Sequence, residues 1–468
     1  MRSGRAIDYQ ALCQNASQRA ALMREAGVGS GSIVAMCHGE GVVLLTDLFA
    51  AWANGATALV LSPSLTSHER KRICAWAQPA CWIGQLDSPE TSIIPPEIGQ
   101  RTSAELGEIS CPPRDGPALM LMTSGSTGVP KGVVISHRAL NARLLGNIAR
   151  IGKQNLARTL VPLPLHFGHG LIGNTLTPLL AGCDVLLWPE PGVSGFAQVG
   201  SVIDDQSITF LSSVPSMWRI GLKLSPPPRR GTLKRVHVGS EPLPAALWKG
   251  ICEWSGTSRV FNMYGMTEAA NWISGTSAED SGFVDGSVGR PWTGSFRILR
   301  DDGTISETGE GEVLLHDPGL MSGYWNDPEI TAAAFHGSWF RTGDVGEIDT
   351  NGNLRISGRL KHQINRAGIK VTAEEVELLL EQHADVQDVC AFALPDAVSG
   401  EIVAAAVVPK SGRDIGESAL QAWCAERVRR EAVPSRIVFL AEIPRNDRGK
   451  KVRSEVRDRV SAMLRREG

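Results

Sequence analysis

Residues 121–132 read LMTSGSTGVPKG and bring together three glycines, two serines, two threonines and one lysine. Glycines let the backbone approach a bulky anion and adopt positive φ, while hydroxyl and exposed N–H groups donate hydrogen bonds. Lys131 adds a positive charge. This composition suits a cradle for phosphate groups. A Ser/Gly-rich turn between two strands is also a common hairpin loop, so the stretch alone leaves both interpretations open.

The segments around this loop limit which phosphate-binding motif it could be. The apolar runs 118–120 and 133–135 are too short for helices, and they predict a strand–loop–strand unit followed by a helix from Ser136. A Walker A loop ends in Gly-Lys-Ser/Thr and leads directly into a helix. Here the loop ends in Pro130-Lys131-Gly132 and a strand follows. A P-loop kinase or motor is therefore disfavoured.

Length and composition indicate a multidomain enzyme. With 468 residues the chain is too long for one ordinary core. A net charge of −2 argues against nucleic acid or an anionic membrane as a general partner. Nine dispersed cysteines without a CxxC pair suit a reducing cytosol. The first residues lack an apolar signal core, and polar residues interrupt the most hydrophobic window, 42–62. We expect a soluble cytoplasmic protein.

Alternating strand and helix patterns run through the first half of the chain. They predict helices at 8–26, 42–53, 65–77, 137–150, 170–181, 196–204 and 214–224, and strands at 33–36, 56–61, 80–83, 158–162, 184–188 and 208–212. This βα alternation predicts parallel sheets covered by helices. From about residue 281, short β-like runs at 295–299, 311–315 and 344–348 predict a small β-barrel or an antiparallel appendage.

The pattern changes again after Gly358-Arg359. Helices at 373–384 and 416–430, strands at 387–394, 401–407 and 436–439, and a basic, turn-rich end PRNDRGKKVR predict a compact α+β unit. The predicted fold class is α/β: a large N-terminal domain of helix-covered sheets with a small β-barrel-like part, followed by a small mobile α+β domain. We place the domains at 1–360 and 361–468.

Six stretches, taken in order, resemble the adenylate-forming superfamily of acyl-CoA synthetases, luciferases and peptide-synthetase adenylation domains. They are MTSGSTGVPKG (122–132), NMYGMTEA (262–269), GEVLLHDPGLMSGYW (311–325), WFRTGDVGEID (339–349), SGRLKHQINRAGIKV (357–371) and PRNDRGKK (444–451). The resemblance implies that ATP activates a carboxylic acid to an acyl-adenylate with release of pyrophosphate, and that a thiol then takes the acyl group. It also implies a mobile C-terminal lid.

The same resemblance assigns the nucleotide site. It implies that the glycine-rich loop holds the β- and γ-phosphates, that Asn262 reads the adenine amino group and that Asp344 accepts the ribose hydroxyls. Glu268 would hold Mg²⁺, since its carboxylate is a hard oxygen ligand. The implied ATP-binding residues are Thr123, Ser124, Gly125, Ser126, Thr127, Gly128, Lys131, Gly239, Ser240, Glu241, Asn262, Tyr264, Gly265, Asp344 and Arg359.

The implied catalytic residues are Lys450, Thr267, Glu268 and His166. Lys450 would bridge the acid carboxylate and the α-phosphate, because two anions must be held in line while charge grows at phosphorus. Its neighbour Lys451 is the obvious rival, and by composition alone RGKK is a solvated basic tail. The resemblance also places a hinge at Lys361 and the wall of a pantetheine tunnel at Gly368.

The acid pocket departs from the family pattern. The usual Pro-Leu-Phe-His order is replaced by Pro164-Leu165-His166-Phe167, so either His166 or His169 could take the gating role, or be a structural histidine. No aspartate that could pair with an ammonium lies between residues 162 and 180, which favours an aryl or fatty-type acid over an α-amino acid. The implied lining is Phe167, His169, Gly170, Asn174, Ser213 and Val214, together with Gly239, Ser240, Tyr264 and Gly265.

Several partners stay open at this point. CoA is the leading acyl acceptor, with a carrier-protein phosphopantetheine or an amine as alternatives. A different class, an ATP-binding but non-catalytic regulator, is disfavoured because Lys131, Glu268, Asp344, Arg359 and Lys450 are all present. A homodimer could cover an exposed sheet edge.

Overall fold

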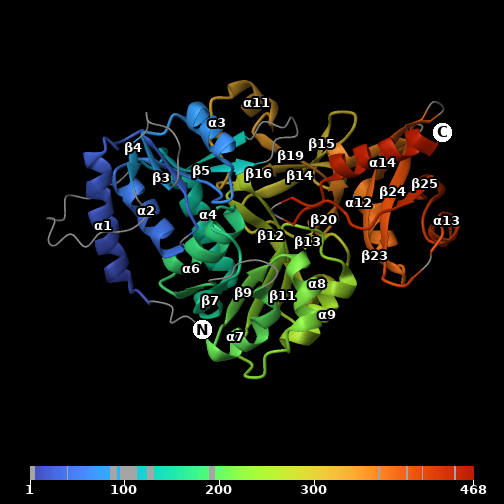
Figure 1. Cartoon of the computed structure of the whole chain (residues 1–468), viewed down its shortest axis with the longest axis horizontal. Helices are drawn as coiled ribbons and strands as arrows, with labels where there is room; N and C mark the ends of the chain where they lie inside the picture. The colour runs from blue at the N-terminus through green and yellow to red at the C-terminus, as the bar shows by residue number, and fades with distance from the viewer. Residues whose placement is uncertain are drawn as a thin grey trace.

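The computed structural model describes residues 6–39, 41–84, 92–94, 113–123, 131–188, 195–366, 369–396, 399–413, 415–446 and 449–467. Four β-sheets and the helices that cover them make up this part of the chain (Figure 1). No helix within these segments combines the length and the hydrophobicity needed to cross a bilayer.

The first sheet has the strand order β17-β6-β5-β2-β1-β3-β4. Its central strands β1 (Ile33–Cys37) and β2 (Thr57–Val60) are buried along their whole length, as expected for parallel strands covered on both faces. Strands β5 (Pro117–Thr123) and β6 (Lys131–Ser136) form the expected antiparallel hairpin. Helices α1 (Tyr9–Glu25), α2 (Gly41–Ala53) and α3 (Ser67–Ala77) accompany this sheet, which also contains β3 (Cys81–Gly84), β4 (Ser92–Ile94) and β17 (Gly323–Tyr324).

The second sheet has the order β12-β11-β10-β9-β7-β8. Its strands are β7 (Arg158–Val161), β8 (Asp184–Leu187), β9 (Phe210–Ser213), β10 (Arg235–Gly239), β11 (Val260–Met266) and β12 (Asn271–Ser277). The accompanying helices are α4 (His137–Ile151), α7 (Val199–Asp205), α8 (Pro215–Leu224) and α9 (Ala245–Ser255). The expected helix at 170–181 is instead a buried π-helix, η1 (His169–Leu176), continued by the short α6 (Thr177–Leu180). π-helical turns are rare and often occur at functional sites.

The third sheet follows the order β13-β20-β19-β16-β14-β15. It contains β13 (Ser287–Gly289), β14 (Ser295–Leu299), β15 (Ile305–Ser306), β16 (Gly309–His316), β19 (Trp339–Ile348) and β20 (Leu354–Arg359), with β18 (Phe335–His336) paired to β19. Its antiparallel pairing agrees with the expected β-rich part, but the path is open at β13 and β15. The sequence pattern could not distinguish this open sheet from a closed barrel.

The fourth sheet builds the C-terminal domain, drawn in orange and red beside β15 and β20 in Figure 1. Its strands are β21 (Gln363–Arg366), β22 (Ile369–Thr372), β23 (Val386–Asp396), β24 (Gly400–Pro409) and β25 (Arg436–Phe439). Helices α12 (Ala373–Leu380), α13 (Glu417–Ala425) and α14 (Arg453–Glu467) belong to it as well. A hydrophobic core from Ile364 to Ile437 draws only on this part of the chain, so the α/β class with a distinct C-terminal domain is confirmed. The exact boundary at 360/361 stays a prediction.

Candidate functional site

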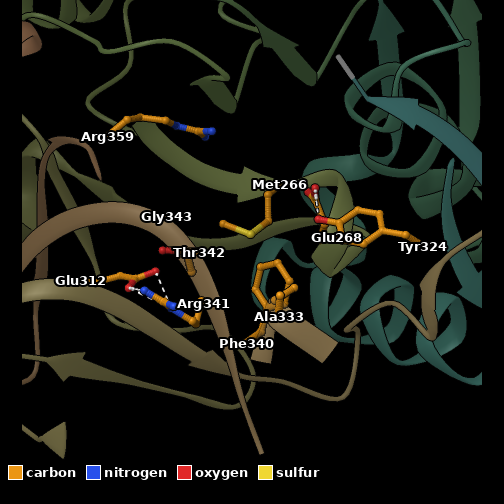
Figure 2. Close-up of a pocket in the computed structure, with 11 residues that line it drawn as sticks. Met266, Glu268, Glu312, Tyr324, Ala333, Phe340, Arg341, Thr342, Gly343 and Arg359 are labelled. Carbon is orange, nitrogen blue, oxygen red and sulfur yellow. Dashed lines mark hydrogen bonds and ion pairs between the residues drawn. The ribbon is translucent and has the colours of Figure 1, made fainter. Parts of the chain in front are cut away.

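A cavity of about 240 Å³ lies where the end of β11 and the short helix η3 (Thr267–Ala269) face β19 (Figure 2). Figure 2 shows Glu268 and Tyr324 together on one side, with Arg341 paired to Glu312 on another. The cavity is lined by Met266, Glu268, Glu312, Tyr324, Ala333, Ala334, Phe340, Arg341, Thr342, Gly343 and Arg359. Two of the residues expected at the nucleotide, Glu268 and Arg359, therefore share one hollow.

Glu268 is held by a residue far away in the chain. The Tyr324 hydroxyl donates a hydrogen bond of 3.1 Å to Glu268 Oε1, and Lys131 Nζ lies 5.0 Å from the centroid of the Tyr324 ring. Burial and the Glu268 charge both raise the pKa of Tyr324, which keeps the phenol protonated as a donor. Strand pairing between β6 and β17 brings Lys131 and Tyr324 together, and the backbone hydrogen bond from Met321 to the Glu268 carbonyl oxygen places Glu268 beside them.

The glycine-rich loop is described only at its two ends. Thr123 and Lys131 lie opposite each other in the β5–β6 register, and the Thr123 hydroxyl donates to the Lys131 carbonyl oxygen at 3.5 Å. Strands β5 and β6 therefore extend further toward the loop than the apolar runs 118–120 and 133–135 predict. The remaining phosphate contacts that the resemblance implies lie outside the described residues, namely Ser124, Gly125, Ser126, Thr127 and Gly128.

Asp344 is a buried carboxylate with both oxygens engaged. Arg359 Nε lies 2.7 Å from Oδ1, and the Tyr264 hydroxyl donates to Oδ2 at 2.6 Å. Asp344 and Arg359 are also register partners in the β19–β20 pair. Burial raises the pKa of Asp344, and the charge of Arg359 opposes that shift. The structure thus joins three expected ATP-binding residues, and a nucleotide would meet a carboxylate already positioned by two partners.

Asn262 and the glycines of this region have different surroundings. Asn262 is buried and its Nδ2 donates to the Ser287 carbonyl oxygen at 2.8 Å. A Cβ built on Gly265 would lie 2.3 Å from the Asn271 carbonyl oxygen, and one on Gly239 would lie 2.8 Å from that of Met263. These two positions therefore exclude side chains. Packing against the neighbouring backbone therefore requires glycine at both positions.

His169 is buried and held between two serines. Its Nδ1 lies 2.9 Å from Ser240 Oγ and its Nε2 lies 2.7 Å from Ser212 Oγ. Ser240 has a left-handed φ of 70°, an uncommon conformation for a serine, and this conformation aims its hydroxyl at the ring. Burial, assisted by the charge of Lys450, lowers the pKa of His169 to about 3. A neutral ring with both nitrogens engaged fits a positioning role, while His166 lies against Phe167, with ring centroids 4.0 Å apart.

This shifted pKa predicts how the stability of the protein depends on pH. Below pH ~6.5 the unfolded chain protonates His169 whereas the folded chain does not, so the free energy of unfolding falls as pH is lowered toward 3. The slope from this one group is about 1.4 kcal/mol per pH unit. Urea unfolding at pH 7, 6, 5 and 4 measures it. The His169→Asn variant should show a shallower fall, and equal slopes in the two proteins would contradict the assignment.

The other residues expected at the acid pocket divide between two faces of β9. Asn174 Nδ2 donates to the Ser212 carbonyl oxygen at 3.0 Å, on the side of η1. Ser213 is oriented toward α8 instead, where its hydroxyl accepts from Trp218 Nε1 at 2.7 Å. Val214 directly precedes α8, and a Cβ on Gly170 would lie 2.3 Å from the Pro164 carbonyl oxygen. The structure therefore brings His169, Gly170 and Asn174 together, while the Ser213 side chain packs on the opposite face.

Lys450 reaches the large domain from the C-terminal one. Gly449 has a φ of 76°, and a Cβ built on it would lie 3.7 Å from Ser216 Oγ. Burial raises the pKa of Glu241 and of Asp344, and in both cases the Lys450 charge opposes the rise. The positive charge of Lys450 therefore affects the pKa of three residues at the rim of the candidate site, namely His169, Glu241 and Asp344.

Lys451, the adjacent lysine, is directed the other way. Its Nζ lies 3.1 Å from Glu381, 3.4 Å from Glu377 and 3.7 Å from Asp388, all within the C-terminal domain. These carboxylates raise the pKa of Lys451 despite its burial, and Arg453 joins the same network through Glu377 at 2.6 Å. Lys451 thus anchors the C-terminal domain internally, and of the two lysines only Lys450 is directed toward the cavity side.

Contacts between the domains surround the expected hinge. Arg219 of α8 lies 3.2 Å from Glu381, and Lys370 lies 2.5 Å from Asp301. Lys361 lies in the 3-10 turn Leu360–His362 directly after Arg359, and burial lowers its pKa. Both ion pairs are exposed on at least one side and so contribute little to stability. Gly368, the expected tunnel residue, lies outside the described residues.

The donor set around Glu268 fits Mg²⁺ but does not enclose it. The described segments contain no group of three or more His, Cys, Asp or Glu side chains able to hold a metal. Mg²⁺ is usually held by one or two carboxylates, with substrate phosphates and water completing the octahedron. Glu268, with one oxygen bonded to the neutral Tyr324 hydroxyl, matches that arrangement.

Some residues of this site were not found from the sequence. Tyr324 lies within the recognised GLMSGYW stretch, but the contact that gives it a role depends on strand pairing across nearly two hundred positions. Arg235 and His237, buried one after the other on one face of β10, carry no local motif. Only the apolar alternation of Val236 and Val238 could have indicated which face they share.

Comparison with known proteins identifies the family of the chain. The model of the AMP-binding enzyme family matches residues 1–325, and that of the AMP-binding enzyme C-terminal domain matches residues 375–450. An oxalate–CoA ligase of Arabidopsis thaliana is 30% identical over 94% of this chain and 90% of its own. The long-chain-fatty-acid–CoA ligase FadD13 of Mycobacterium tuberculosis is 29% identical over 98% of this chain and 94% of its own.

Solved structures share the whole fold. The o-succinylbenzoate CoA synthetase MenE of Bacillus subtilis, in complex with its acyl-adenylate intermediate, superposes with a TM-score of 0.87 at 25% identity, covering 97% of this chain and 94% of that one. ATP-bound MatB of Rhodopseudomonas palustris gives a TM-score of 0.87 at 24% identity, over 98% and 94% of the two chains. Since the family model covers well over half of the residues, this chain belongs to the AMP-binding enzyme family.

Proposed function

We propose that the chain is an AMP-forming acid–CoA ligase that activates an aryl or fatty-type carboxylic acid. One observation carries the assignment of its chemistry: Tyr264 and Arg359 hold the buried carboxylate of Asp344 beside the cavity that Glu268 lines, and Gly449, next to Lys450, lies against Ser216 of the large domain. A cation supplied by the C-terminal domain next to a polar cleft suits a reaction between two anions.

In the first half-reaction a carboxylate oxygen of the acid attacks the α-phosphorus of ATP. The new C(O)–O–P bond forms as the bond to the bridging oxygen breaks, and pyrophosphate leaves. Lys450 offsets the charge shared by the carboxylate and the α-phosphate, and Lys131 holds the departing phosphates. Mg²⁺ held through Glu268 would supply further neutralisation of the triphosphate. Thr267, next to Glu268, donates its hydroxyl to the α-phosphate.

Nucleotide binding exchanges partners at Asp344. In the structure the two carboxylate oxygens accept from Arg359 and from the Tyr264 hydroxyl. The ribose hydroxyls take over as donors to Asp344, which frees the Arg359 guanidinium for the ribose or phosphate. Because each lost hydrogen bond is replaced by another, ordering the nucleotide leaves no buried carboxylate oxygen without a donor.

In the second half-reaction the CoA thiolate attacks the acyl carbon, the thioester forms and AMP leaves. We propose that residues 361–468 rotate about Lys361 for this step, which withdraws Lys450 and brings the segment containing Gly368 to the large domain. CoA ligases among the relatives favour CoA as the acceptor, as in the Arabidopsis enzyme. Transfer to a carrier-protein phosphopantetheine or to an amine is the second candidate, because it uses the same adenylate.

We further propose a cytoplasmic location and a homodimer. The eight cysteines of the described segments are all free thiols, as expected in a reducing compartment that supplies ATP and CoA. The first sheet ends at β4 and β17, and a second copy could cover one of these edges. Light scattering of the purified protein tests the dimer.

Pyrophosphate exchange tests the proposed function. The protein is incubated with ATP, labelled pyrophosphate and single aryl, fatty or amino acids, and the label entering ATP is followed. Exchange with aryl or fatty acids, followed by thioester formation on adding CoA, is expected. ATP binding without exchange for any acid would instead favour a non-catalytic regulator, and acyl transfer only to a carrier domain would favour the second candidate.

A further inference from the structure

The second sheet contains a buried histidine, next to the expected acid-pocket residue His169, that the reaction does not use. His237 is fully buried on β10, two residues before Gly239, and pairs in register with Ser212, whose hydroxyl contacts His169. Phe210 and Trp272 flank the His237 ring at centroid distances of 4.8 Å each. His237 therefore lies on the same side of the second sheet as His169 and deeper within it.

Arg235 determines the protonation of this ring. Its Nε–H donates to His237 Nε2 at 2.8 Å, and a guanidinium can only donate. Nε2 must therefore be the unprotonated nitrogen, and in the neutral ring the hydrogen resides on Nδ1. Burial, together with the adjacent Arg235 charge, lowers the pKa of His237 well below its ordinary value, so the neutral form is the one present.

The resulting Nδ1–H has no hydrogen-bond partner among the described residues. Asn174 Oδ1, an acceptor, is in the same condition, and Asn174 Nδ2 is bonded to the backbone of Ser212, the register partner of His237. A buried donor, His237 Nδ1–H, and a buried acceptor, Asn174 Oδ1, thus both lie near Ser212 of β9, and neither has a hydrogen-bond partner among the described residues. Leaving such groups unpaired is costly, whereas a hydroxyl can accept from one and donate to the other.

We propose that His237 is a specificity-determining residue that selects acids bearing a hydroxyl group away from the reacting carboxylate, with Arg235 as the positioning residue that fixes its tautomer. This inference rests on the proposed function, since it refines the acid of the same reaction. The hydroxyl accepts from His237 Nδ1–H and donates to Asn174 Oδ1, while the surrounding rings of Phe210 and Trp272 contact the apolar body of the acid.

Matched acid pairs test this. Benzoate with 3- and 4-hydroxybenzoate, and hexanoate with 6-hydroxyhexanoate, are compared by kcat/KM in pyrophosphate exchange. The ratio of hydroxylated to plain acid in the best pair should be on the order of tenfold to a hundredfold, the effect of one unpaired buried donor. In His237→Phe the ratio should collapse toward one. His237→Asn, which keeps an N–H near the Nδ1 position, should restore part of it.

Two further variants separate the roles. Arg235→Met frees the tautomer of His237 and should reduce the ratio less than His237→Phe does. Asn174→Leu removes the acceptor and should also lower the ratio, which keeps the test valid if His237→Phe does not fold. The ratio, unlike total activity, is unaffected by a general loss of folded protein.

Other results would overturn the inference. If exchange occurs but plain acids match their hydroxylated partners, or if His237→Phe leaves the ratio intact, the two polar groups are satisfied by water or by each other. A preference for dicarboxylic acids of the same length would make the Arg235 charge the selecting feature instead. If no acid supports exchange, the proposed function itself fails. This outcome is distinguishable from the others, because in all of them exchange occurs.

Discussion

Lys450→Ala is expected to lower the rate of acyl-adenylate formation by about 10²–10³-fold, the usual effect of removing one preorganised electrostatic contact. The reason is positional: Lys450 follows Gly449, which lies against Ser216 of the large domain, and the Lys450 charge opposes the rise that burial causes in the pKa of Glu241 and of Asp344. Transfer from a chemically prepared adenylate to CoA should remain close to the wild-type rate, because Lys450 is withdrawn in that step. Pyrophosphate exchange and single-turnover thioester formation measure the two steps separately.

Lys451→Ala provides the matched control at the next position. It removes the positive charge that pairs with the carboxylates of Glu377, Glu381 and Asp388. The remaining negative charges repel one another, so the unfolding temperature of the protein should fall. The folded fraction should still form adenylate. If Lys450→Ala impaired both half-reactions equally, or if Lys451→Ala abolished adenylation in well-folded protein, the assignment of Lys450 would be wrong.

Lys361→Pro is expected to spare adenylation and to slow thioester formation at least tenfold. Lys361 is the second residue of a short 3-10 turn, a place where proline fits because its fixed φ suits the first turn of a helix. The arrangement that delivers Lys450 should therefore persist. Rotation of the C-terminal domain requires new dihedral angles at the pivot, and the proline ring prevents them.

Lys361→Ala distinguishes the side chain from the backbone. It removes the ammonium group near Arg359 and Arg453 but keeps backbone freedom, so both steps should continue. Pyrophosphate exchange and CoA thioester formation, measured on both variants, show whether the side chain or the backbone freedom of residue 361 is needed for the second step. A proline variant with normal thioester formation would place the pivot elsewhere.

Much of the fold was predictable because local patterns coincide with burial. The hairpin of β5 and β6, the caps of α1 and α3, and the fully buried strands β1 and β2 all follow from short-range signals. The π-helix η1 was not predictable, since a wider helical turn leaves the apolar pattern of 169–176 almost unchanged. Helix α14 was missed because its mean hydropathy is low and the basic residues before it resemble a solvated tail.

Site residues that belong to a sequence motif could be predicted. The orientation and partners of their side chains could not, because these depend on packing in the folded chain. The adjacent Lys450 and Lys451 are indistinguishable in sequence, and only the fold directs one outward and binds the other to three carboxylates. The pairing of Asp344 with Tyr264 joins strands 80 positions apart. The arrangement around His237 depends on which face of β10 is covered, information that no window of residues contains.

The first sheet of the large domain is completed by strand β17, which comes nearly two hundred residues after its partner β6 in the sequence. The two residues of β17, Gly323 and Tyr324, pair with β6 and close one edge of a sheet otherwise built from residues 33–136. A fragment that stops before this strand would expose the free side of β6, an apolar edge open to pairing with other chains. A recombinant fragment intended to bind nucleotide must therefore extend past Tyr324. This residue contacts Glu268 and also belongs to the strand that protects the sheet from aggregation.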